Sequence, residues 1–182
     1  MKALVLALTA AALTYSIRAS AEGGKTPLPT VRLGFGDRSS IGPEPGPTDG
    51  FDFDVTAGVN LYFGREMALT HPLSPQFLVA PTVGLDKGGD VTAFIGGIGI
   101  GGGCPMFAGL LEAKVLAGTW RDDWTFVGGR FGGSVQAFMG VLAFEGGYEL
   151  DTIEGVLRPA KVFMFRLDLG AAVPLIFIAA MG

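Results

Sequence analysis

The segment FDFDVTAGVNLYF, residues 51–63, alternates between apolar and polar side chains at nearly every step. Its odd positions hold Phe, Val, Ala or Leu, and its even positions include Asp52, Asp54 and Asn60. A period of two places successive side chains on opposite faces of a β-strand, so this segment predicts a strand with one apolar and one polar face. The alternation alone is equally compatible with an apolar face that packs into a core and one that contacts lipid.

The same alternation recurs along the chain between segments rich in Gly, Pro and Asp, which are typical of turns. It predicts eight strands, at residues 29–36, 51–63, 76–86, 90–100, 106–119, 124–138, 141–150 and 161–177. One segment is ambiguous, because residues 107–118 also fit an amphipathic helix that begins after Pro105 and ends at Gly118. An even number of strands closes an up-and-down barrel, which favours the strand.

A two-residue turn at Met139 and Gly140 predicts the register between two of these strands. This turn sets Ser134 opposite Glu145, Phe131 opposite Tyr148, and Arg130 opposite Glu149. Aromatic then faces aromatic on one side of the pair, and opposite charges face each other on the other side, which is the pairing that stabilises neighbouring strands.

The connections between the predicted strands also alternate in character. Long or polar links, expected at one end of an up-and-down barrel, occur at residues 36–50, 86–90, 120–123 and 151–160. The links expected at the other end are 64–75, 101–105 and 139–140.

The first residues have the form of a secretory signal peptide. Lys2 precedes an apolar run at 3–13, and Ala19-Ser20-Ala21 matches the small-x-small cleavage site. We interpret residues 1–21 as a cleaved signal and residues 22–182 as one domain; a buried N-terminal helix is the alternative.

The composition favours a chain whose surface is covered by something other than water. Only 16% of the residues are charged, against about a quarter in a typical soluble domain, and the chain contains 30 Gly and 14 Phe. No apolar run reaches the ~20 residues of a membrane helix, since the longest candidate, 170–182, is interrupted by Pro174. A closed barrel is the other structure that spans a bilayer.

The polar faces of the strands carry most of the charged residues. They are Arg32, Asp52, Asp54, Glu112, Lys114, Arg130, Glu145, Glu149, Arg166 and Asp168. An eight-stranded barrel has room inside for about one layer of side chains, so the many Phe, Leu and Val residues cannot all point inward. We therefore expect them to point outward into lipid, and expect an internal network of ion pairs that includes Arg130 with Glu149 and Arg32 with Asp168.

Aromatic residues near the ends of the predicted strands suit the two membrane interfaces. They are Phe51, Tyr62, Phe63, Trp120, Trp124 and Tyr148. The sequence thus predicts an all-β fold, an antiparallel up-and-down eight-stranded transmembrane β-barrel. A secreted, water-soluble β-barrel that binds an apolar ligand inside is the alternative.

With its signal peptide, its strands and the tail DLGAAVPL (168–175), the chain resembles the small outer-membrane β-barrel proteins of Gram-negative bacteria, of the type of outer-membrane proteins A, X and W. The tail is similar to the assembly signal of that family, although the chain ends on Ile-Ala-Ala-Met-Gly after Phe177. The resemblance implies an outer-membrane location, with membrane lipid and the barrel-insertion machinery as partners. It further implies a structural role or a surface-interaction role through the extracellular loops, with an unknown surface ligand, or a narrow pore.

Other binding chemistry finds little support in the sequence. The net charge of −4 and the lack of a basic cluster exclude nucleic acid as a partner. The glycines at 97–102 match the G-x-G-x-x-G pattern, but the rest of the chain lacks the strand and helix alternation of a dinucleotide fold. We expect no cofactor and no metal site, because His71 and Cys104 are the only His and Cys and an ion-pair role is the better interpretation of Asp52 and Asp54.

Catalysis is a third, weaker alternative. Some barrels of the resembled family modify lipid A, and such an enzyme needs a base beside a hydroxyl group. Here His71 lies near Thr70 and Ser74, in a predicted link rather than on a strand. We therefore expect no enzymatic activity.

Overall fold

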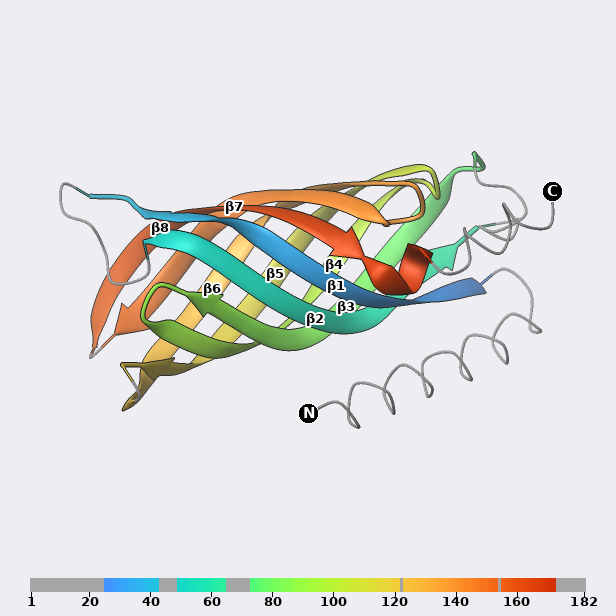
Figure 1. Ribbon diagram of the computed structural model, residues 1–182. Helices are drawn as coiled ribbons and strands as arrows, with labels where there is room; N and C mark the ends of the chain where they lie inside the picture. The colour runs from blue at the N-terminus through green and yellow to red at the C-terminus, as the bar shows by residue number, and fades with distance from the viewer. Residues whose placement is uncertain (1–24, 43–48, 65–72, 122, 154, 173–182) are drawn as a thin grey trace, which may run out of the picture.

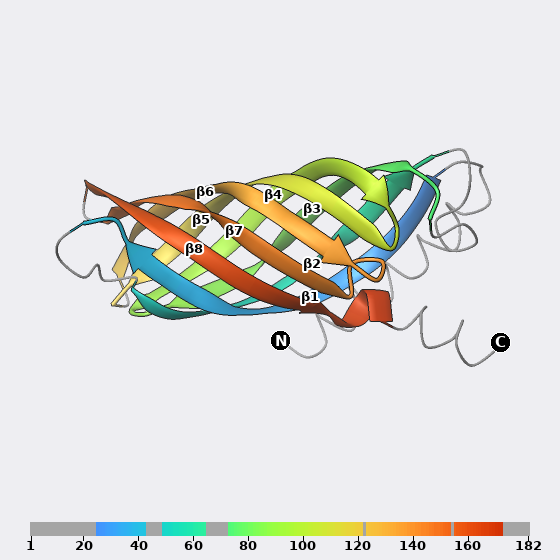
Figure 2. The same cartoon turned by 90° about the horizontal axis from the view of Figure 1, so that it is seen from above.

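Eight antiparallel strands close into one barrel in the computed structural model, which describes residues 25–42, 49–64, 73–121, 123–153 and 155–172 (Figure 1). The strands are β1 (Lys25–Ser40), β2 (Gly50–Phe63), β3 (Gln76–Gly88), β4 (Val91–Cys104), β5 (Phe107–Trp120), β6 (Asp123–Ala137), β7 (Leu142–Ile153) and β8 (Val156–Asp168). Each strand pairs with the next in the sequence, and β1 pairs with β8 to close the ring. The strands run obliquely around an elongated barrel (Figure 2).

The strands lie where the alternation predicts them, and several are longer than expected. Arg38 belongs to β1 rather than to a link, because the alternation continues through it, and β8 already begins at Val156. As a result, the links 89–90, 121–122 and 154–155 are only two residues long. Three of the four links expected at this end are therefore shorter than predicted, although they remain polar, with Asp90 and Arg121 among their residues, and 41–49 is the long one.

The ambiguous segment 107–118 is a strand, as favoured, and forms most of β5. The register predicted for β6 and β7 is also confirmed, with Arg130 opposite Glu149 and Phe131 opposite Tyr148. The intervening turn uses left-handed backbone conformations at Phe138 (φ 53°) and Met139 (φ 61°), besides Gly140 (φ 89°). Left-handed residues at the centre of a tight turn match the twist of the strands that they join.

The predicted last strand, 161–177, ends early. Residues 169–172 form a turn of helix instead, and residues 173–177 lie outside the described residues. Asp168 caps this turn, since its Oδ1 accepts a hydrogen bond of 3.0 Å from the backbone N–H of Ala171. No helix in the described part of the chain is long and apolar enough to cross a membrane.

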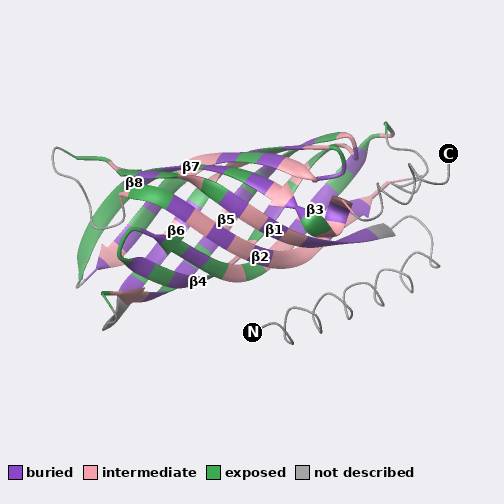
Figure 3. Ribbon diagram, in the orientation of Figure 1, coloured by how far each residue is buried: buried purple, intermediate pink, exposed green. Residues whose placement is uncertain are grey.

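Burial alternates along the strands with the same period as the sequence (Figure 3). The apolar members face outward: Phe131 is 57% exposed and Phe165 is 39% exposed. The charged members Arg130 and Glu149 are buried inside the barrel. The barrel therefore has an apolar outer surface and a charged interior.

Candidate functional site

The interior of the barrel is the candidate site, and the structure brings all ten predicted charged residues into it. Every one of them is buried: Arg32, Asp52, Asp54, Glu112, Lys114, Arg130, Glu145, Glu149, Arg166 and Asp168. The period of two explains why, because these residues occupy the inward positions of β1, β2 and β5 to β8. Their contacts divide them into three groups.

The first group is built around two arginines. The Nε of Arg130 donates to Oε2 of Glu149 at 2.5 Å, and its Nη2 lies 2.9 Å from Oδ2 of Asp86 and 3.3 Å from Oδ2 of Asp52. The Nη2 of Arg38 contacts the same three carboxylates, at 2.7 Å from Asp86 and at 3.2 Å from both Asp52 and Glu149. Two guanidinium groups thus share three carboxylates, each charge having more than one partner.

The second group contains a lysine and an arginine among three carboxylates. The Nζ of Lys114 lies 2.5 Å from Oε2 of Glu112 and 2.5 Å from Oε2 of Glu145. Arg166 pairs with Glu145 from its Nη1 and with Asp54 from its Nη2. Glu145 therefore joins the two cations.

The third group joins the first strand to the last. The Nε of Arg32 donates to Oδ2 of Asp168 at 3.2 Å, and its Nη2 donates to Oδ1 of Asn60 at 2.8 Å. The other oxygen of Asp168 accepts the backbone N–H of Val31 at 3.1 Å. Both pairs expected from the sequence, Arg32 with Asp168 and Arg130 with Glu149, are thus formed.

Two members of the network were missed in the sequence. Arg38 is fully buried, although the sequence predicts it in the link 36–50, and Asp86 is fully buried at the end of a predicted strand. The signal that identifies them is the alternation itself, because Arg38 continues the inward positions of Arg32 and Asp86 continues those of β3. Gly and Ser residues near the ends of a strand are typical of turns, but the strands continue through them.

Apolar side chains occupy the interior toward both ends of the barrel. One cluster, toward the 138–141 turn, contains Leu28, Tyr62, Leu78, Ala80, Ala108, Leu110 and Met139. The other, toward links 89–90 and 121–122, contains Val91, Ala93, Ile95, Leu116, Phe126 and Ile153. The two clusters separate the ion pairs from the ends of the barrel, which keeps the pairs in a low-dielectric interior.

The predicted interface aromatics occupy two different environments. Tyr62 is only 2% exposed and belongs to the first apolar cluster, so its expected place at the outer surface is wrong. It occupies an even position of β2, which faces inward like Asn60. Trp120 packs against the second cluster, under the guanidinium of Arg121 at 5.0 Å, and the side chain of Trp124 lies outside the described residues. Phe51 and Tyr148 are exposed, and Phe63, like Trp120, is half-buried.

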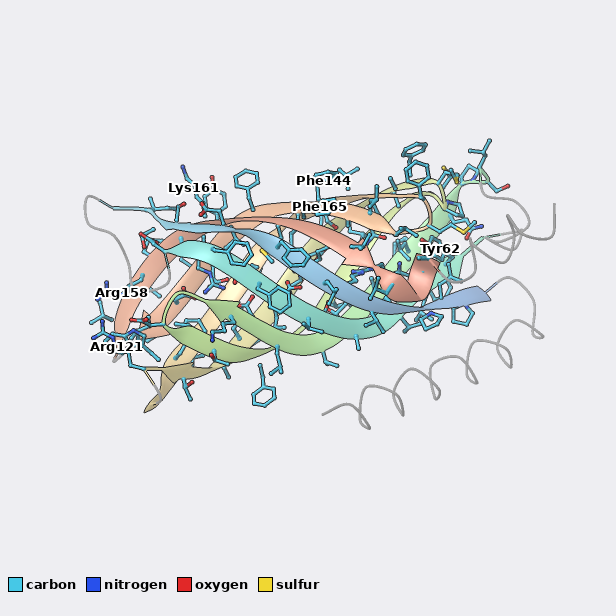
Figure 4. The ribbon with its side chains drawn as sticks, viewed as in Figure 1. Tyr62, Arg121, Phe144, Arg158, Lys161 and Phe165 are labelled. Atoms are coloured by element: carbon cyan, nitrogen blue, oxygen red, sulfur yellow. The ribbon has the colours of Figure 1, made fainter. Side chains whose placement is uncertain are left out.

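The outer surface is almost free of charge. On the strands, among the side chains that the structure describes, the exposed charged residues are Asp37, Lys87, Arg158 and Lys161. All four lie toward the end that carries links 41–49, 89–90 and 154–155, and Figure 4 shows Arg158 and Lys161 there. Between this end and the 138–141 turn, the outer wall is covered by apolar side chains, with ring pairs such as Phe144 and Phe165, whose centroids are 5.2 Å apart.

The other motifs form no site among the residues that the structure describes. Glycines 97–102 lie inside β4, which is followed by another strand and not by a helix. Cys104 is a free thiol at the end of β4, and His71 lies outside the described residues. Within the described ranges, no group of three or more His, Cys, Asp or Glu side chains is arranged to hold a metal ion.

The chain was also compared with known proteins. No family profile, no curated protein and no solved structure matches it at a significant level.

Proposed function

We propose that the chain is a bacterial outer-membrane β-barrel with a structural role and no enzymatic activity. One observation carries the proposal: the apolar side chains of the strands point out of the barrel, while the charged side chains point inward and form ion pairs. A protein folded in water places these two kinds of side chain the other way round.

The extent of the apolar surface supports a hydrocarbon environment. Exposed large side chains occur on all eight strands, including Phe77 on β3, Phe94 on β4, Val115 on β5 and Phe163 on β8. Soluble monomers rarely expose apolar patches larger than a few hundred Å². A surface of this kind that surrounds a barrel suits contact with lipid, and the closed ring of strands pairs the backbone groups that lipid cannot satisfy.

The length of the strands also fits. The strands contain 12 to 16 residues. At about 3.3 Å per residue and a tilt of roughly 40°, a twelve-residue strand rises about 30 Å, which is the thickness of a bilayer's hydrocarbon core. The exposed charges at one end then lie at the level of the lipid headgroups.

The interior favours a closed barrel over a ligand-binding one. A soluble barrel that binds an apolar ligand needs an apolar cavity, whereas the middle of this interior holds ion pairs such as Lys114 with Glu145. The structural role requires outer-membrane lipid and, through the tail at 168–175, the barrel-insertion machinery. Any surface ligand would meet the 41–49 link, the longest at its end of the barrel.

Cell fractionation tests the proposal. The chain is expressed in a Gram-negative host with its predicted signal, and its membranes are washed with sodium carbonate and then extracted with detergent. We expect the protein in the outer-membrane fraction, released by detergent only and migrating faster on gels when it is not boiled. Recovery of folded protein from the carbonate wash, without detergent, would overturn the proposal.

A further inference from the structure

A groove crosses the outer wall of the barrel from β4 to β8. It has a volume of about 650 Å³ and is lined mostly by apolar side chains and glycine backbone. Its centre is a pair of outward glycines, Gly133 on β6 and Gly146 on β7, which lie directly opposite each other. In the same row Leu111 pairs with Gly133, and Phe163 pairs with Gly146. Leu111 is 77% exposed and stands as a wall on one side of this floor. On the other side the ring of Phe163, which is 68% exposed, lies over Gly146, because a Cβ on Gly146 would be 3.3 Å from its Cε1. The open part of the floor is therefore at Gly133, where a Cβ would have only the carbonyl oxygen of Leu110 near it, at 3.4 Å.

The floor continues to a third outward glycine. Gly109 on β5 lies diagonally beside Gly133, and no heavy atom lies within 4 Å of the place where a Cβ on Gly109 would be. Val135 and Phe144, which are opposite each other, close the groove toward the 138–141 turn. The hollow therefore exists because glycines replace the apolar side chains that fill the surrounding wall.

The chemistry of the lining fits an uncharged occupant. Two inward residues, Ser134 and Glu145, reach the groove from below. Glu145 is already paired with Lys114 and Arg166, and Ser134 donates to Glu112, so neither side chain requires a polar partner from outside. An apolar cover also keeps water away from these ion pairs.

We propose that this groove binds one acyl chain of a membrane phospholipid. The inference rests on the proposed membrane location, because the groove is continuous with the apolar surface that faces lipid there. A protein strand cannot dock by backbone hydrogen bonds, since the floor strands β5, β6 and β7 are each paired on both sides. Gly133 lies four residues from the end of β6 at Ala137, so the lipid comes from the leaflet on the side of the 138–141 turn.

Native mass spectrometry tests the site. The full chain is inserted into vesicles of palmitoyl-oleoyl phosphatidylcholine, extracted in mild detergent, and compared with the variant Gly109→Leu/Gly133→Leu, which fills the groove. We expect the wild type to retain one phospholipid and the filled variant to retain about tenfold less, as expected when contact with a few methylene groups is lost. Gly96→Leu is the matched control, because Gly96 is an outward glycine with equally open space that does not line the groove.

Each outcome has a distinct meaning. Equal lipid retention in all three proteins would overturn the acyl-chain site, and so would a dimer mass that disappears only in the filled variant, because a second copy would then occupy the groove. If the filled variant does not insert, Gly109→Leu alone replaces it. Failure of the wild type itself to insert into vesicles would contradict the proposed function, whereas insertion without lipid retention contradicts this inference only.

Discussion

At the scale of single residues, Arg130 shows how strongly the interior depends on its ion pairs. Its side chain is 1% exposed and contacts three buried carboxylates, those of Asp52, Asp86 and Glu149. We predict that Arg130→Met, which keeps an unbranched apolar stem but removes the guanidinium, lowers the free energy of unfolding by about 3–5 kcal/mol, because it leaves carboxylates buried without enough positive charge. Urea unfolding in vesicles, followed by gel mobility without boiling, measures the loss.

Arg121 provides the matched control for that substitution. It forms an ion pair of similar length with Asp90, 3.0 Å, but the two side chains are 68% and 53% exposed. An exposed pair contributes about 0–1 kcal/mol, so Arg121→Met should have little effect. Equal losses for the two variants would mean that the interior is hydrated and that its ion pairs behave like surface pairs.

At the scale of strands, glycine determines how closely β6 and β7 approach. Gly132 and Gly147 form an opposed pair on the inner face, and a Cβ on Gly147 would lie 2.5 Å from the carbonyl oxygen of Phe131. We predict that Gly147→Ala lowers the free energy of unfolding by about 1–3 kcal/mol, because the strand backbone must move. The control is Gly133→Ala, whose Cβ would meet its nearest atom, the carbonyl oxygen of Leu110, at 3.4 Å. The same urea titration applies, and a smaller loss for Gly147→Ala than for the control would contradict this account.

The strands are also the scale at which the sequence is most informative. Alternation with a period of two predicts the number of strands, the inward place of Arg130 and Glu149, and their register, because each follows from the local pattern. The same pattern mispredicts the end of the last strand at Asp168, since helix and strand both fit an apolar tail. It also fails for Tyr62, whose aromatic ring suggests an interface although its even position faces inward.

The contacts between distant strands lie beyond local patterns. Which cation meets which carboxylate depends on how the closed ring brings strands across the interior, as when Arg38 of β1 reaches Asp86 of β3 and Glu149 of β7. The sequence predicts that the interior holds charges of both signs, four basic and six acidic among the ten predicted residues, but only the closed barrel assigns most of the partners. The groove over Gly133 and Gly146 likewise needs the register of five strands, β4 to β8.

At the scale of the whole molecule, the response to an outward charge should depend on its height along the barrel. Phe131 lies in the middle of β6 and Leu157 near the start of β8, yet they are similarly exposed, 57% and 62%. In a bilayer, we predict that Phe131→Arg lowers the free energy of unfolding by about 2–4 kcal/mol and Leu157→Arg by about 0–1 kcal/mol. Unfolding from phosphatidylcholine vesicles measures both. Equal effects would indicate that water surrounds both positions.

A closed interior also predicts how the molecule behaves toward ions. The two arginines of the first ion-pair group, Arg38 and Arg130, have side-chain exposures of 0% and 1%. An apolar cluster also lies toward each end of the barrel. We predict no conductance when the protein is inserted into planar bilayers, since an ion must displace paired charges and cross apolar layers. Phe126→Ala, which removes an aromatic ring from one apolar cluster, should also show no conductance, because the ion pairs still fill the middle of the barrel. Stepwise currents in the wild type would show instead that the ion pairs rearrange, and the structural role would then have to include a narrow pore.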